Sequence, residues 1–201
     1  MRPLLSLCLL SLAPLMAAPV AAADTSPAAV PAGKYVMDKE HKKLIWSVDH
    51  MGFSTFYGRF TDFQATAMLD PKKPSANSVE VTINMNSAES DTAKLDGELK
   101  GAQWFDAGRF PTATFKSTGV TPGAAGRAKV AGNLTLHGVT KPVTLDVVFH
   151  GGGMHPMMKV QTVGFDATTT IKRSDFGVST FLPMIGDNVK LMISAEFHLE
   201  K

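Results

Sequence analysis

The side chains best suited to bind a transition metal lie in one short stretch of this sequence. It contains two imidazole and three thioether groups, on His150, Met154, His155, Met157 and Met158. Imidazole and thioether groups together suit Cu(I), so copper binding is one interpretation. The other is a flexible, glycine-rich hairpin loop that binds nothing. The sequences of such loops vary, so a chance gathering of these residue types is expected. The second interpretation is the simpler one, and we predict neither a metal site nor a required cofactor.

Motifs of the common enzyme classes are missing from the sequence. It has no G-x-S-x-G elbow, no H-E-x-x-H zinc motif, no phosphate-binding loop and no dinucleotide-binding glycine signature. The one cysteine, Cys8, lies in the N-terminal apolar segment, which excludes cysteine nucleophiles and thiolate metal sites from the rest of the chain. Serine, histidine and aspartate all occur, but a triad is recognised only by geometry. We therefore predict a protein that is not an enzyme.

The N-terminus has the pattern of a cleavable export signal over residues 1–23. An apolar run follows Arg2 and leads to a small-residue cleavage site. We expect a flexible Pro/Ala-rich tail over residues 24–32 and a single domain over residues 33–201. Removal of Arg2 changes the formal charge from +2 to +1, which gives no indication of a nucleic-acid partner. No later apolar run reaches the roughly 18 residues of a membrane span, so we expect an exported protein that does not cross a membrane.

Most of the domain alternates between apolar and polar residues, as half-buried strands do. The clearest case is the hairpin over residues 134–149, in which Gly138 supplies a positive φ for the turn and Pro142 begins the second strand. A bulge between Phe60 and Phe63 is needed to place both rings on one face. The expected strands cover residues 33–38, 44–50, 57–69, 79–85, 112–120, 129–136, 142–150, 160–172 and 188–199.

One convincing helix is expected over residues 90–101. Leu95 and Leu99 lie four residues apart on one face, and Ser90 or Asp91 is placed to cap the first turn. The narrow apolar stripe continues into Trp104 and Phe105. A single helix followed by aromatic residues is typical of a lid over a sheet.

The eight or nine expected strands favour an all-β barrel over a sandwich. A closed barrel removes the edges that so many uncovered strands would leave. Eight strands enclose a space that side chains just fill or that holds one small ligand. Small residues recur on the inward faces and leave room inside, namely Ala65, Ala67, Gly132, Gly164, Ala167 and Ala195.

Several stretches resemble the YceI-like, polyisoprenoid-binding proteins of the bacterial periplasm. They are GKYVMD (33–38) followed by His41, the strand that ends at His50, YGRF (57–60), AQWFD (102–106), FPTATF (110–115), GNLTLHGVTKPV (132–143), IKRSDFG (171–177) and IGDNV (185–189). Their order and spacing, rather than any single motif, carry the resemblance.

The resemblance implies an extended, eight-stranded, antiparallel lipocalin-like barrel with an apolar tunnel for a long lipid, a polyprenyl or quinone-type molecule. An ordinary filled core is the alternative for each residue of the proposed tunnel. The lipid-contact candidates are Trp46, His50, Phe60, Phe63, Val81, Ile83, Leu95, Leu99, Trp104, Phe105, Phe115, Leu134, Leu145, Val147, Phe165, Phe176, Leu191 and Ile193.

Polar contacts with a lipid head group are expected from few residues. His50 faces inward, either as a core histidine bonded to a backbone carbonyl or as a contact at the tunnel mouth. Arg59, Lys172 and Arg173 are interpreted as solvated strand ends. If two of them converge on the mouth, they meet a phosphate or a quinone carbonyl.

Three functions follow from these expectations. The first is periplasmic binding or transport of an isoprenoid lipid. The second is delivery of a quinone or metal to a membrane redox or stress-response partner, since relatives often occur beside or fused to membrane cytochromes. The third is a barrel with a filled core whose outer surface binds protein. A homodimer is a further assembly to consider.

Overall fold

The computed structural model describes residues 23–201. This part of the chain forms ten strands, whose side chains alternate between the inside and the outside. The strands are β1 (Gly33–His50), β2 (Ser54–Phe60), β3 (Phe63–Leu69), β4 (Ser78–Asn84), β5 (Ala88–Glu89), β6 (Thr112–Pro122), β7 (Arg127–Leu136), β8 (Val139–Met154), β9 (Gln161–Lys172) and β10 (Asn188–Leu199). One α-helix, α1 (Ala93–Lys100), follows β5. The short 3-10 helices are η1 (Pro27–Ala29), η2 (Pro74–Ala76), η3 (Met85–Ser87) and η4 (Arg173–Phe176).

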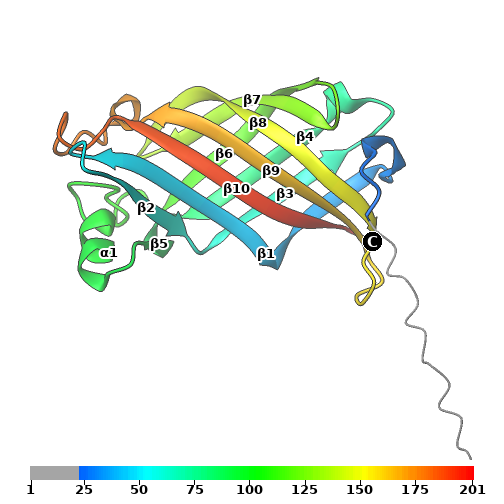
Figure 1. Ribbon diagram of the computed structural model, residues 1–201, viewed down its shortest axis with the longest axis horizontal. Coiled ribbons are helices and arrows are strands. Elements are labelled where there is room, and N and C mark those ends of the chain that lie inside the picture. Colours follow the sequence, from blue (N-terminus) through cyan, green and yellow to red (C-terminus); the bar gives the residue numbers. More distant parts are fainter. Residues whose placement is uncertain (1–22) are drawn as a thin grey trace, which may run out of the picture.

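The strands form one antiparallel sheet that closes on itself (Figure 1). Their order is β10-β9-β8-β7-β6-β4-β3-β1-β2-β5, and β10 also pairs with β1. Because β2 and β3 follow one another along the same side of β1, they occupy a single position in the wall. Strands β4 and β5, which pair with β3 and β2, likewise share the next position, so the ten strands fill eight positions. The result is the expected eight-stranded barrel with one helix, which confirms the predicted fold class.

Strand β1 is a single strand, although two strands were expected over its length. Met37 and Leu44 both face the interior, yet they lie seven residues apart, so strict alternation would place them on opposite faces. A shift in the pairing with β10 between Met37 and Lys42 resolves this conflict. The chain therefore bulges instead of turning.

The expected long strand over residues 57–69 is likewise interrupted. Strand β2 ends at Phe60 and β3 begins at Phe63, so that both rings are buried, as the expected bulge required. The Lys42 ammonium group donates a hydrogen bond to the Phe63 carbonyl oxygen beside this break.

The hairpin between β7 and β8 turns on only two residues. His137 and Gly138 both have positive φ, 51° and 76°, as the tightest antiparallel hairpins require. Strand β8 starts at Val139, so the expectation that Pro142 begins it was wrong. Pro142 is tolerated because β8 has no β9 neighbour until Asp146, and its missing N–H breaks no bond on that side.

The helix is shorter than expected, and its cap is a different residue. Thr92, not Ser90 or Asp91, is the N-cap, and its hydroxyl accepts a bond from the Leu95 amide. None of the helices among the described residues is long and apolar enough to cross a membrane.

The two ends of the barrel are covered differently (Figure 1). Helix α1 and the loops after β1 and η4 lie at one end, and the N-terminal segment lies at the other. Residues 1–22 of the expected export signal lie outside the described residues. The segment expected to be a flexible tail contacts the barrel at two points, because Asp24 exchanges two backbone hydrogen bonds with Gly152 and Val30 is buried. The Tyr35 hydroxyl also donates to the Pro31 carbonyl oxygen at 2.9 Å.

Candidate functional site

The barrel interior contains two cavities, of about 180 and 210 Å³. We call the one beneath α1 the helix-end cavity and the other the central cavity. Leu44, Ile83, Leu134 and Leu191 line both. The two cavities are therefore neighbouring compartments separated by these four side chains, and together they form an elongated apolar space.

A third cavity of about 320 Å³ continues this space toward the N-terminal segment. It shares Leu69 and Phe165 with the central cavity, and Pro27 and Val30 form part of its wall. The chain start is thus part of the interior surface at the end opposite the helix.

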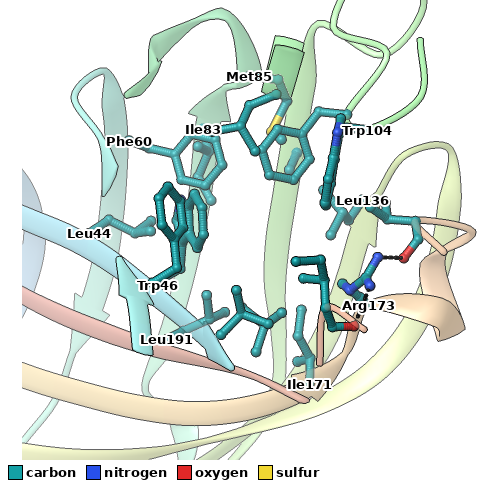
Figure 2. A pocket seen from close by; sticks show the side chains of 18 of the residues that line it. Leu44, Trp46, Phe60, Ile83, Met85, Trp104, Leu136, Ile171, Arg173 and Leu191 are labelled. Atoms are coloured by element: carbon teal, nitrogen blue, oxygen red, sulfur yellow. Dashed lines mark hydrogen bonds between the residues drawn. The ribbon is translucent and has the colours of Figure 1, made fainter. Parts of the chain in front are cut away.

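The helix-end cavity is walled mainly by large apolar side chains (Figure 2). Trp46 and Phe60 come from β1 and β2, Leu99 from the buried face of α1, and Trp104 from the loop after it. Gly58 is required here, because a Cβ at this position would lie 2.1 Å from the Trp46 indole ring.

The central cavity owes its space to small inward residues. Ala65 and Ala67 from β3, Ala167 from β9 and Ala195 from β10 line it. Each was expected to leave room inside the barrel. Of the described residues that line this cavity, none is charged.

The sequence-predicted lipid contacts line these cavities, with one exception. Phe176 lines neither cavity and packs instead, 1 % exposed, in a separate core cluster. The helix-end cavity receives Trp46, His50, Phe60, Leu95, Leu99, Trp104 and Phe105, and the central cavity receives Phe63, Val81, Phe115, Leu145, Val147, Phe165 and Ile193. Ile83, Leu134 and Leu191 belong to both.

Sequence reasoning missed several lining residues for two reasons. Leu44 and Val48 alternate inward with Trp46 and were identifiable from that pattern. Val178 and Ile185 belong to the loop after η4, where no periodicity indicates which side chains face the interior.

Arg173 differs most from expectation. Its interpretation as a solvated strand end was wrong, because only 4 % of it is exposed and it lines the helix-end cavity. Its guanidinium donates to the carbonyl oxygens of Val178, Ile185 and Gly186 at 2.8–2.9 Å. It also lies 5.5 Å from the centre of the Trp104 ring. These bonds hold the loop after η4 over the cavity.

Arg173 is buried, with one carboxylate close to its guanidinium. Burial lowers the pKa of the guanidinium, while the nearby Asp187 carboxylate opposes that shift. Burial alone would raise the pKa of Asp187, but hydrogen bonds from Ser174 and the charge of Arg173 hold it below its ordinary value. A buried cation with a partial counter-charge thus borders an otherwise apolar space.

The other two head-group candidates lie outside the barrel. Arg59 forms an ion pair with Glu89 across β2 and β5 at 2.8 Å, and its side chain is 57 % exposed. Lys172 is exposed between the buried residues Ile171 and Arg173. The three cations therefore do not converge on the cavity.

Only part of the expected histidine- and methionine-rich loop is a loop in the structure. Strand β8 extends to Met154, so Gly151 and Gly152 are strand residues rather than loop residues. They are glycines for a packing reason, because a Cβ on Gly151 would lie 2.9 Å from Ala23, and one on Gly152 would lie 3.2 Å from Val30.

The imidazoles of this stretch already have partners. His150 Nε2 lies 2.7 Å from Asp166 Oδ2 on the neighbouring strand. His155 Nδ1 accepts bonds from the amides of Met157 and Met158 at 3.3 and 3.2 Å. Met154 and Met157 are strongly exposed.

Comparison with known proteins agrees with this architecture. Residues 35–197 match the family model of the YceI-like domain. The chain is 41% identical over 174 residues to "Protein YceI" of Salmonella arizonae, covering 86% of this chain and 90% of that protein. The crystal structure of BcnA from Burkholderia cenocepacia has a TM-score of 0.73 at 28% identity, covering 80% of this chain and 98% of that one. A polyisoprenoid binding domain from Saccharophagus degradans, at 14% identity, covers 85% of this chain and 100% of its own with a TM-score of 0.60 and shares the fold. The chain belongs to the YceI-like domain family.

Proposed function

We propose that this protein binds one long isoprenoid lipid, a polyprenyl or quinone-type molecule, and shields it from water without reacting with it. The observation that carries the proposal is the pair of adjoining apolar cavities inside the closed barrel. Burial of each CH₂ group is worth roughly 0.8 kcal/mol, so a few isoprene units offset the cost of ordering the chain. The structural neighbour described as a polyisoprenoid binding domain supports the same ligand class.

The lipid head group belongs in the helix-end cavity and the tail in the central cavity. Ionisable side chains border only the first of these cavities, namely His50, Glu98 and Arg173. The guanidinium of Arg173 has more N–H donors than its three carbonyl bonds use. Trp46 Nε1 is buried without a hydrogen-bond partner, which is costly unless a ligand oxygen accepts its proton. Trp46 and Arg173 lie on opposite sides of this cavity (Figure 2).

The compartment that we propose is the periplasm, reached by export through the N-terminal signal. Delivery to a membrane cytochrome or another quinone-dependent partner is the specific role that a quinone-type ligand would support. The donors of Arg173 and Trp46 favour a ligand with carbonyl or phosphate oxygens over a pure hydrocarbon.

Lipid extraction from the purified protein tests the binding function. The full chain is expressed with its own leader, purified without detergent and extracted with organic solvent for mass spectrometry. We expect an isoprenoid in stoichiometric amount. Absence of lipid from the extract, together with failure of the empty protein to bind an added long isoprenoid, would contradict the proposal.

The orientation of the lipid is tested by Trp46→Phe, which removes the indole N–H but keeps an aromatic ring. Affinity for an isoprenoid quinone should fall by about 1 kcal/mol more than affinity for squalene, because only the quinone has an oxygen to accept the bond. Both affinities are measured by isothermal titration calorimetry on the wild-type protein and on the variant. An equal loss for the two ligands would show that Trp46 contributes only apolar surface.

A further inference from the structure

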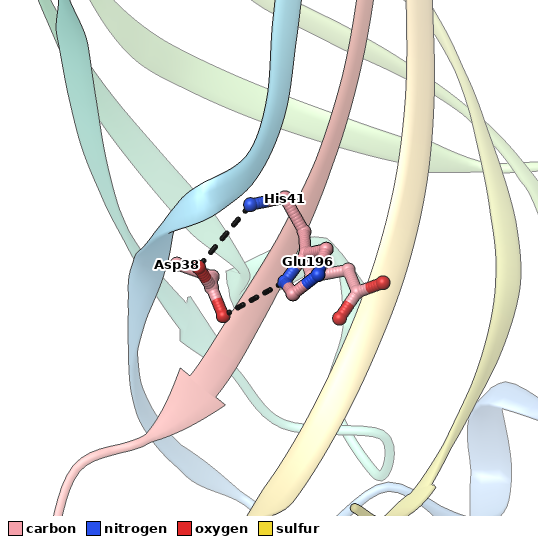
Figure 3. Close-up of side chains that lie close together, drawn as sticks. All are labelled: Asp38, His41 and Glu196. Carbon is pink, nitrogen blue, oxygen red and sulfur yellow. Dashed lines mark hydrogen bonds and ion pairs between the residues drawn. The ribbon is translucent and has the colours of Figure 1, made fainter.

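A cluster of metal-ligating side chains lies on the outer face of the barrel, where β10 meets β1. Asp38 and His41 belong to the bulge of β1, and Glu196 lies opposite on β10 (Figure 3). Their ligand atoms all lie within 4.8 Å of one another. Within residues 23–201, this is the one group of at least three such residues that meets this distance.

The bulge fixes the Asp38 carboxylate in place. Its Oδ1 accepts hydrogen bonds from the amides of Glu40 and His41, at 2.6 and 3.2 Å. Its Oδ2 lies 3.3 Å from His41 Nδ1 and 2.7 Å from His198 Nε2. Asp38 is only 8% exposed, so one buried oxygen is aimed at two imidazoles from different strands.

We propose that Asp38, His41 and Glu196 bind a divalent transition-metal cation of the Zn²⁺ class. Imidazole nitrogen and carboxylate oxygen are ordinary zinc ligands. Ligand atoms of a tetrahedral zinc site lie about 3.3 Å apart, which small side-chain rotations reach from the present positions. His198 Nε2 lies 2.7 Å from Asp38 Oδ2 and helps to fix the orientation of that carboxylate.

The surrounding charge favours a cation at this position. The Asp38 and Glu196 carboxylates both lie beside the His41 imidazole, and their negative charge attracts a cation. Bound metal would tie β1 to β10 where their backbone register shifts, and it would do so outside the lipid cavities.

Isothermal titration of the tag-free mature chain with ZnCl₂ tests the site. We expect a single site, with His41→Ala and Glu196→Gln each weakening it by about tenfold or more, since loss of even an outer partner of a ligand costs that much. The His41 side chain is 58% exposed, and Glu196→Gln keeps the size of a half-buried side chain. We therefore expect both variants to fold as the wild type does, which circular dichroism without zinc verifies. Asp38 is left unchanged because it supports the bulge.

His150→Ala is the matched control. It removes an exposed imidazole that also lies 2.7 Å from a carboxylate but belongs to no group of three ligands. We expect unchanged zinc affinity in this variant, and X-ray absorption with nitrogen and oxygen neighbours in the wild-type protein. Absence of binding heat, or an affinity that survives both His41→Ala and Glu196→Gln, would overturn the proposal.

Discussion

Leu191→Trp is expected to abolish the preference for long lipid chains while short chains still bind. Leu191 lines both cavities, so a bulky indole there would fill the boundary across which a long ligand must extend. A long isoprenoid would then bury only the part that fits in the helix-end cavity. Loss of a few buried CH₂ groups, at roughly 0.8 kcal/mol each, weakens binding by about 100-fold.

The measurement compares geraniol with long polyprenols in the wild-type protein and in the variant. Met192→Trp is the matched control, because its neighbour Leu191 faces the cavities and residue 192 therefore lies on the opposite side of β10. We expect the control to keep the wild-type dependence on chain length. A Leu191→Trp variant that binds long chains with undiminished affinity would show that ligand does not occupy the two cavities together.

Arg173→Met is expected to lower the free energy of unfolding by about 3 kcal/mol, because it leaves buried carbonyl groups without their charged donor. The three carbonyl oxygens belong to Val178, Ile185 and Gly186, so the loop over the helix-end cavity should loosen first. Denaturant unfolding measures the first effect. Hydrogen exchange of the loop amides measures the second.

The neighbouring Lys172→Met serves as the control for charge alone. Lys172 is exposed, so its replacement should change stability by no more than about 0.5 kcal/mol. Equal effects of the two substitutions would mean that the hydrogen bonds of Arg173 contribute little. The same conclusion would follow if the loop amides of the Arg173→Met variant exchanged as slowly as those of the wild-type protein.

The barrel was predictable because most strands are half-buried and alternate cleanly. In β10 the inward positions Val189, Leu191 and Ile193 follow one another without interruption, and the predicted bounds match the structure. All of the lipid contacts predicted from the sequence except Phe176 line the two cavities. Periodicity reports which side of a strand is covered, and in a barrel that side is the interior.

Features that depend on distant parts of the chain were not predictable. Arg173 is buried because carbonyl groups from the following loop surround it, and no local pattern indicates that loop's path. Gly151 and Gly152 resemble a loop, yet they lie in β8 to make room for the N-terminal segment. The mismatch between Met37 and Leu44 was compatible with a turn as well as a bulge, and only the pairing with β10 decides between them.

The contact between the N-terminal segment and the barrel affects the route by which a lipid enters and leaves. Because Pro27 and Val30 form part of the wall opposite the helix, the N-terminal segment covers part of that end of the barrel. Under the proposed function, the lipid enters and leaves beneath α1 and the loop that Arg173 holds. The N-terminal segment at the other end then limits the tail length that the barrel accommodates.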